Sequence, residues 1–367
     1  MSARGSAHGR VNLVGEHTDY NGGLVLPTVI PQQTEMVVER QSDRLIRLRT
    51  EARGMAPVEV PLDATAPRRD WSDHVLGVVD ALRRRGHDLG GFAAEVRSTV
   101  PLGAGLSSSA ALGVATVRGL REAFALRIDD RDVALIAHES EDQFVGAHVG
   151  LMDQLVCSLG REGEALRIDL RDRSTRHIAL DRIDMEIAVI DSGIRHQHAT
   201  GDYQKGRDSG PSSTGRATPG SYNVRRRECE DAARALGVRT LRDVGVSTDT
   251  SALSPMLARR VRHVLSENAR VDAAVDAIER SDAPTLGDVI KASHASLRDD
   301  FEVSLPVIDD IVAAAQRESD VHGARLVGGG FGGSVLVLTR RGAARAVAER
   351  IASRSGSLKV VLPAAVR

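Results

Sequence analysis

The sequence of 367 residues predicts an α+β fold in two lobes that share a cleft. Strand-like runs precede a long helical pattern in the first half, helical patterns dominate the second half, and a glycine-rich turn followed by a strand comes near the end. A hydrophobic content of 41% is enough to build a core in each lobe. We therefore expect an N-terminal domain over 1–185 and a C-terminal domain over 186–367, with no internal repeat.

Strands and helices are expected to alternate in the first half of the chain. Small and apolar residues recur at helical spacing after residue 107, which indicates a helix. The expected strands cover residues 35–39, 45–48, 92–100, 165–170 and 186–191, and the expected helices cover about 107–126 and 130–144.

The second half begins with a change in composition. Residues 201–221 are crowded with Gly, Ser, Thr and Pro, a composition that cannot bury a core and that predicts a mobile loop. Helical patterns then extend from 225 to about 317. A strand at 336–338 and a helix near 343–353 are expected to follow.

Composition and charge exclude several classes of protein. A net charge of -1 and a pI near 6.9 give no basic field for nucleic acid and no polybasic patch for a membrane. Aromatic residues make up only 2%, so base-stacking platforms are not expected. Cys157 and Cys229 are too few for a disulfide framework or a thiolate metal site. Because the sequence also lacks an apolar run for export or for a membrane span, we expect a cytoplasmic protein.

Residues 9–27 concentrate polar side chains between short apolar runs. Arg10, Glu16, His17 and Asp19 lie in this segment, with glycines at positions 15, 22 and 23. Carboxylate and imidazole groups on a tight loop offer the directional hydrogen bonds that a neutral, hydroxyl-rich ligand needs. Any one of these residues alone could belong to a polar surface turn, but the combination favours a site over a core.

A second motif joins a strand to a helix and reads Val-Pro-Leu-Gly-Ala-Gly-Leu-Ser-Ser-Ser-Ala-Ala over 100–111. Its two glycines let the backbone approach a ligand, and the unpaired N–H groups of a helix start favour an anion. The alternative is that the serines only cap the helix. No Gly-Lys dipeptide occurs in the chain, so this is not a Walker loop. The charge of a nucleotide must then be balanced by backbone dipoles and a metal ion.

A third motif, Gly-Gly-Gly-Phe-Gly-Gly over 328–333, also fits the Gly-x-Gly-x-x-Gly pattern of dinucleotide-binding folds. That pattern requires a helix after its last glycine, whereas Ser-Val-Leu-Val-Leu follows here and predicts a strand. We therefore expect a glycine-rich turn between strands.

Together the three motifs resemble those of the galactokinases, members of the GHMP small-molecule kinase superfamily, in the same order and over nearly the whole chain. The resemblance implies a two-lobed GHMP-kinase fold, with a mixed-sheet N-terminal domain, an α/β C-terminal domain and the active site in the cleft between them. It also implies ATP as co-substrate and Mg²⁺ as cofactor.

The resemblance assigns a role to individual residues. By itself an aspartate before a glutamine is typical of a helix cap, but the family pattern implies that Asp153 is the catalytic base, with Arg10 keeping it ionised and stabilising the transferring phosphoryl group. An Asp153 that stays ionised acts either by removing the proton of the hydroxyl or by orienting it, and both alternatives stay open. Glu141 lies in a charge run typical of a solvated helix face, and the pattern implies that it binds Mg²⁺ together with Ser109. The implied sugar contacts are Glu16, His17, Asp19, Gly150, Asp153 and Tyr222. The implied nucleotide contacts are Gly103, Ala104, Gly105, Leu106, Ser107, Ser108 and Ser109.

The sequence departs from the family pattern at three places. Only nine residues precede Arg10, which predicts either that the first sheet lacks a strand or that the chain starts at a downstream methionine. The stretch 201–221 is an insertion, and Tyr203 within it competes with Tyr222 as the sugar contact. Ser334 stands where a cysteine is frequent, a change that we expect to be harmless.

The implied reaction is ATP-dependent phosphorylation of the anomeric hydroxyl of D-galactose. Two alternatives stay open: a related kinase for N-acetylgalactosamine or L-arabinose, and a non-catalytic sensor of sugar and ATP. The expected partners are small molecules only, without nucleic acid or membrane, for a monomer or weak oligomer.

Overall fold

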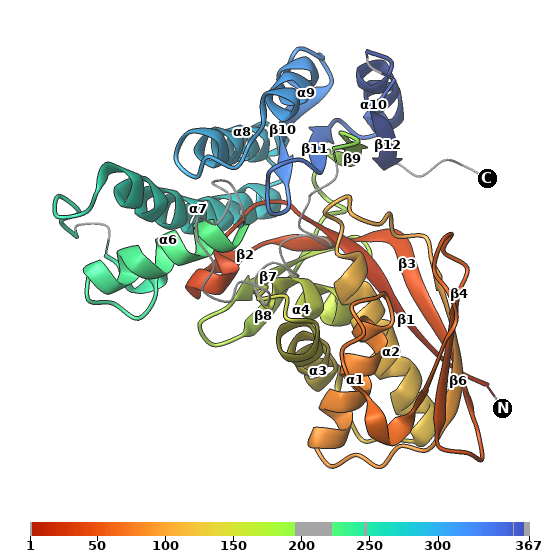
Figure 1. Cartoon of the computed structure of the whole chain (residues 1–367). Helices are drawn as coiled ribbons and strands as arrows, with labels where there is room; N and C mark the ends of the chain where they lie inside the picture. Colours follow the sequence, from red (N-terminus) through yellow and green to blue (C-terminus); the bar gives the residue numbers. More distant parts are fainter. Residues whose placement is uncertain (1, 195–221, 246–247, 355, 363–367) are drawn as a thin grey trace. The chain divides into compact units, whose positions relative to one another are not determined.

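Figure 1 shows the computed structural model of the chain, which describes residues 2–194, 222–245, 248–354 and 356–362. The predicted loop at 201–221, with Tyr203, lies outside the described residues. The chain divides into two compact units. Unit 1 consists of Met1–Arg10, Val29–Leu102 and Leu106–Glu162, and unit 2 consists of Val11–Thr28, Gly103–Gly105 and Gly163–Arg367.

This division differs from the two consecutive domains expected at 1–185 and 186–367. Strands β7 (Glu164–Asp169) and β8 (Ser174–Ala179) belong to unit 2. β7 pairs antiparallel with both β8 and β2 (Leu24–Val25), so backbone hydrogen bonds hold these strands with the 11–28 segment. Pairing between strands far apart in sequence sets the boundary between the two units. Local composition does not predict such pairing.

Unit 1 contains a mixed sheet and four α-helices. β3 (Pro27–Arg40), whose first two residues belong to unit 2, pairs antiparallel with β6 (Phe92–Ser98). β6 pairs parallel with β4 (Leu45–Thr50), and β4 pairs antiparallel with β5 (Val58–Pro61). The helices are α1 (Asp73–Arg84), α2 (Ser108–Phe124), α3 (Asp130–Glu139) and α4 (Met152–Leu159), with a 3₁₀ turn at Leu62–Ala64 and a π-helical segment at Ser140–Val145. The helix expected at 130–144 is therefore α3 continued by π-helical turns, and α1 was not predicted.

The expectation that a strand is missing at the start of the first sheet is wrong. Residues Ser2–Asn12 form β1, which pairs with β3. The strand contains small residues because it lies tightly against α2: a Cβ added at Gly5 would clash with the backbone of Ala115 and Gly119. A sequence search for apolar alternation overlooks a strand of this kind.

Unit 2 contains an antiparallel sheet in the order β10-β11-β9-β12, besides the β2-β7-β8 ladder. Its strands are β9 (Glu186–Asp191), β10 (Val321–Val327), β11 (Ser334–Thr339) and β12 (Lys359–Leu362). Its helices are α6 (Tyr222–Ala235), α7 (Pro255–Glu279), α8 (Ala283–Asp299), α9 (Pro306–Gln316) and α10 (Ala344–Ala352), with 3₁₀ turns at Asp19–Asn21 and Leu241–Asp243.

Helices α8, α9 and α10 pack against the sheet of unit 2, and α7 packs against α6 and α8 (Figure 1). Local signals fix the helix starts: Ser254 caps α7 and Asp282 caps α8, each followed by a proline in the first turn. Within the described ranges, no helix combines the length and the apolar composition needed to cross a bilayer.

Candidate active site

In unit 1 the end of β1, the start of α2 and the first turn of α4 bring Arg10, Ser107 and Asp153 together. Arg10 donates from Nε to Oδ1 of Asp153 at 2.8 Å and from Nη2 to Oδ2 at 2.8 Å. The Oγ of Ser107 donates to Oδ2 at 2.6 Å. The Arg10 side chain is 6% exposed and that of Asp153 is 27% exposed, so the carboxylate is oriented by a buried cation and still reaches solvent.

Ser107 lies at the N-cap position of α2 but does not cap it. Its backbone is left-handed, with φ 60° and ψ 43°, and its side chain forms no capping hydrogen bond. The hydroxyl is used by Asp153 instead. The capping alternative is therefore wrong for Ser107. The N–H groups at the start of α2 are therefore not capped by the side chain of Ser107. An anion site requires such uncapped N–H groups.

Glu141 lies in the π-helical segment, 8% exposed, which is not the solvated helix face of the alternative interpretation. Its Oε2 accepts a hydrogen bond from Nε2 of Gln154 at 2.7 Å. Within the described ranges no arginine or lysine forms an ion pair with it. A buried carboxylate that meets only a neutral donor suits a cation.

Ser109, in the first turn of α2, is half-buried. The described residues hold no group of three or more His, Cys, Asp or Glu side chains that could form a complete metal site. A metal ion bound by Ser109 and Glu141 would therefore complete its coordination with phosphate oxygens and water, which is usual for Mg²⁺. Glu141, a buried carboxylate with a neutral partner, fits such an ion.

In unit 2 the segment 13–24 forms a tight turn that carries Glu16, His17 and Asp19. Thr18 fixes the turn, because its Oγ1 lies 2.8 Å from the carbonyl oxygen of Gly15 and 2.6 Å from that of Leu24. Asp19 accepts the N–H of Tyr20 through Oδ1 at 2.9 Å.

His17 is buried among aromatic rings. Its backbone is left-handed, with φ 62°, and its Nδ1 lies 2.9 Å from the hydroxyl of Tyr20. The rings of Tyr222 and Phe301 lie 5.3 and 4.7 Å from its own, centroid to centroid. Burial lowers the pKa of His17 well below its usual value, so the ring is neutral at pH 7. Its Nε2 is buried and meets the distance and angle of a hydrogen bond with no described residue, although the backbone of Gly329 lies near enough to raise the pKa of the ring against the effect of burial.

Glu16 is 3% exposed, and one of its oxygens has two partners. Its Oε1 forms an ion pair with Nη2 of Arg325 at 2.9 Å and accepts a hydrogen bond from the N–H of Gly328 at 2.9 Å. Arg325, fully buried in β10, also donates from Nη1 to the carbonyl oxygen of Leu13 at 2.9 Å. Sequence analysis missed Arg325. The available signal was a single arginine within an apolar strand.

The glycine loop at Gly103–Gly105 belongs to unit 2 and continues along the chain into Leu106 of unit 1. Gly103 and Gly105 have φ values of 69° and 75°, in the left-handed region that favours glycine. Ser334 donates from Oγ to the carbonyl oxygen of Ala104 at 2.7 Å. The 328–333 turn connects β10 to β11, which pair antiparallel with Val327 opposite Ser334. The rejection of a dinucleotide-binding fold is confirmed.

The remaining predicted residues lie close in sequence to Asp153 or to Ser107. Gly150 comes just before α4, which carries Asp153, and Leu106 comes just before Ser107. Leu106 also accepts the N–H of Arg10 through its carbonyl oxygen at 3.2 Å. Ser108 opens α2.

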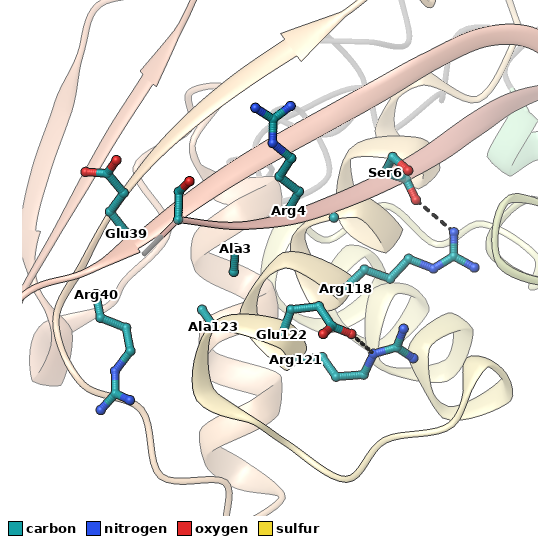
Figure 2. A pocket seen from close by; sticks show the side chains of 11 residues that line it. Ala3, Arg4, Ser6, Glu39, Arg40, Arg118, Arg121, Glu122 and Ala123 are labelled. Atoms are coloured by element: carbon teal, nitrogen blue, oxygen red, sulfur yellow. Dashed lines mark hydrogen bonds and ion pairs between the residues drawn. The ribbon is translucent and has the colours of Figure 1, made fainter.

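A cavity of about 970 Å³ in unit 1 shares no lining residue with these groups. It is bounded by residues 2–6, Glu39, Arg40, Arg118, Arg121, Glu122 and Ala123 (Figure 2). Arg118 donates from Nη1 to the carbonyl oxygen of Ser6 at 2.8 Å, and Nε of Arg121 lies 3.5 Å from Oε1 of Glu122. These two guanidinium groups therefore contact the walls of the cavity itself.

Family models match three parts of the chain. The model of the GHMP kinases N terminal domain matches residues 73–161, that of the GHMP kinases C terminal matches 274–357, and the galactokinase galactose-binding signature matches 3–40. A mevalonate kinase from Methanococcus jannaschii has the same fold, with a TM-score of 0.67 at 14% identity over 98% of this chain and 96% of that one. The fold is that of a GHMP kinase, with both helices and strands and a mixed sheet in its N-terminal part.

Two relatives narrow the class. A galactokinase from Streptomyces coelicolor is 39% identical over 355 residues, which cover 94% of this chain and 87% of that protein. A galactokinase from Lactococcus lactis, solved with galactose, superposes with a TM-score of 0.85 at 26% identity over 98% of this chain and 92% of that one. The chain belongs to the galactokinase family.

Proposed function

We propose that this protein transfers the γ-phosphoryl group of ATP to the anomeric hydroxyl of D-galactose and releases galactose 1-phosphate and ADP. One observation carries the proposal beyond family membership. The carboxylate of Asp153 is held by two hydrogen bonds from Arg10 and one from Ser107, yet stays partly exposed. A sugar kinase needs such a group to orient the attacking hydroxyl or to remove its proton.

The hydrogen bonds at Asp153 indicate which oxygen would serve the substrate. Arg10 takes one acceptor position on each carboxylate oxygen, and Ser107 takes the second position on Oδ2. With respect to the described residues, one acceptor position is left on Oδ1. We assign the sugar hydroxyl to Oδ1.

The reaction balances with these groups. The anomeric oxygen forms a bond to the γ-phosphorus, and the bond from that phosphorus to the β–γ bridging oxygen breaks. The hydroxyl proton passes to Asp153 or, where Asp153 only orients the hydroxyl, to solvent. Arg10 orients the carboxylate through its two hydrogen bonds and adds positive charge beside the transferring group.

We assign sugar recognition to Glu16, His17, Asp19, Gly150, Asp153 and Tyr222. A neutral His17 can hydrogen-bond a hydroxyl without attracting an anion. Glu16 uses Oε1 for Arg325 and Gly328, so Oε2 is the oxygen that a hydroxyl would reach. Recognition by neutral rings and oriented carboxylates suits an unphosphorylated sugar.

We assign nucleotide binding to Gly103, Ala104, Gly105, Leu106, Ser107, Ser108 and Ser109, and Mg²⁺ binding to Ser109 and Glu141. When bound, Mg²⁺ would neutralise charge that develops on the phosphates during transfer. We place the protein in the cytoplasm as a monomer or weak oligomer. The buried free thiols of Cys157 and Cys229 are compatible with a reducing compartment.

The test is an ADP-release assay over galactose, N-acetylgalactosamine, L-arabinose and glucose, with wild type, Asp153→Asn and Asp88→Asn. Asp88 is an exposed residue of the same unit and serves as the matched control. We expect turnover of galactose by wild type and Asp88→Asn, and a loss of about 10²-fold or more in kcat for Asp153→Asn.

Other outcomes contradict parts of the proposal. Equal turnover by wild type and Asp153→Asn removes Asp153 from the mechanism. A preference for N-acetylgalactosamine or L-arabinose identifies the related kinase. Galactose binding without ADP release identifies a sensor.

A further inference from the structure

Three side chains of α7 bind the backbone of the turn that carries Glu16 and His17. They are His263, Glu267 and Asn268, which we call the α7 clamp. Glu267 follows His263 by four positions and shares its helix face, and Asn268 is the next residue, so a single helix reaches both ends of the turn. The turn and the clamp belong to unit 2, although some 250 residues separate them in sequence.

Glu267 binds the start of the turn. Its Oε1 accepts the N–H of Gly15 at 2.9 Å and that of Glu16 at 3.3 Å. The hydroxyl of Ser293 donates to the same oxygen at 2.7 Å. The other carboxylate oxygen of Glu267, Oε2, accepts from Nε of Arg270 at 2.6 Å. Glu267 is fully buried, and although burial alone would raise its pKa, the charge of Arg270 and the surrounding groups bring that pKa to about 2.

His263 and Asn268 bind two further points of the turn. Burial lowers the pKa of His263 to about 4, so the ring is neutral at pH 7. Its Nε2–H donates to the carbonyl oxygen of Glu16 at 3.1 Å, while Nδ1 lies 2.9 Å from the hydroxyl of Ser296, which is also 3.1 Å from Oδ2 of Asp300. Oδ1 of Asn268 accepts the N–H of Leu24 at 2.7 Å.

The turn needs an external support of this kind. Gly15 has φ 99° and His17 has φ 62°, a left-handed conformation that a histidine rarely adopts. A peptide of this sequence would sample other conformations, and the side chains of Glu16 and His17 would then point elsewhere. The clamp satisfies the two N–H groups at positions 15 and 16 and the carbonyl of 16, which leaves few alternatives to the observed backbone.

We propose that the α7 clamp is a positioning device for the sugar, and that Glu267 sets the affinity for the sugar without touching it. This inference rests on the proposed function. The buried carboxylate of Glu267 accepts two backbone N–H groups and so fixes the turn before the ligand arrives. The conformational entropy of the turn is then lost when the protein folds and not when the sugar binds. Loss of the clamp should weaken sugar binding more than it slows phosphoryl transfer.

The test uses the full chain with Glu267→Gln and, as matched control, Asp276→Asn, an exposed acidic residue of the same helix. For Glu267→Gln we expect at least a tenfold rise in KM for galactose, equivalent to 1.4 kcal/mol, with kcat within about threefold and KM for ATP unchanged. Asp276→Asn should match wild type. An unchanged KM for galactose in a folded Glu267→Gln protein overturns the inference.

A second measurement does not depend on turnover. Hydrogen exchange should be faster for the amides of residues 15, 16 and 24 in Glu267→Gln than in wild type, and unchanged for β10. If Glu267→Gln does not fold, Asn268→Ala replaces it and should show the same rise in KM and faster exchange at Leu24. Unchanged exchange in both variants overturns the inference.

The outcomes also separate this inference from the proposed function. A wild-type protein that neither binds nor phosphorylates galactose contradicts the proposed function, whatever the exchange data show. A wild-type protein that phosphorylates galactose, with a Glu267→Gln variant of equal KM, contradicts the clamp alone.

Discussion

Ser107 has two features that a helix-capping serine does not have. Its φ of 60° is unfavourable for any residue with a Cβ, and its hydroxyl bonds Asp153 and not the backbone of α2. Strain of this kind persists only where the surroundings impose it, and it is common in active sites. The serine thus connects the start of α2 to the carboxylate of Asp153.

A pair of substitutions separates the strain at Ser107 from its hydrogen bond. Ser107→Ala and Ser107→Gly both remove the hydroxyl, but only glycine adopts a positive φ without cost. We expect kcat to fall in both variants to a similar extent, and Ser107→Gly to be about 1 kcal/mol more stable than Ser107→Ala. Urea unfolding and the ADP-release assay measure the two quantities. Equal stabilities would mean that the left-handed conformation carries no strain.

Glu16 shows what residue-level sequence analysis leaves out. The motif around it predicted a sugar contact, which stays a prediction. The structure adds that Oε1 is bound by Arg325 and by the backbone of Gly328. No local pattern links positions so far apart in sequence, because only folding brings a residue of β10 to the 13–24 turn.

At the scale of elements, the β10–β11 turn was predictable because its chemistry is local. Glycines at 328, 330, 332 and 333 have φ values of 87°, 82°, 130° and 82°, which other residues rarely adopt, and apolar strands flank them. The close approach of this turn to Val303 was not predictable. A Cβ added at Gly330 would clash with the side chain and backbone of Val303.

Gly330 and Gly342 form a matched pair for this contact. Their φ values are 82° and 83°, but nothing lies within 4 Å of a Cβ added at Gly342. We expect Gly342→Ala to lose about 1 kcal/mol of stability from backbone strain, and Gly330→Ala to lose about 2 kcal/mol more from overpacking. Thermal and urea unfolding of both variants give the difference. Equal losses would show that the turn can move away from Val303.

At the scale of the whole molecule, buried histidines couple stability to acid. Burial lowers the pKa values of His263 and His294 to about 4, and that of His17 well below its usual 6.5. Between pH 6.5 and 4 the unfolded chain binds protons on these residues and the folded chain does not. The contribution of these neutral histidines to the free energy of unfolding is therefore fully present above pH 6.5 and is lost as the pH falls toward 4.

His263→Gln tests the size of this effect. Between pH 6.5 and 4 we expect the free energy of unfolding of wild type to fall by roughly 3 kcal/mol more than that of His263→Gln, the equivalent of one proton. His87→Gln, outside the buried set, is the control and should follow wild type. Urea titrations at a series of pH values give both slopes, and parallel curves for His263→Gln and wild type would contradict the lowered pKa of His263.

The sequence by itself determined the fold class, half of the described strands, most of the described helices and the three motifs, because periodicity, glycine positions and helix caps depend on neighbouring residues. It did not determine that β1 exists, since small residues that pack tightly on α2 lack an apolar pattern. Nor did it determine the boundaries of the two compact units, the ion pair between Arg325 and Glu16, or the α7 clamp. These depend on strand pairing and buried hydrogen bonds between distant segments, whose partners are defined only when the chain has folded.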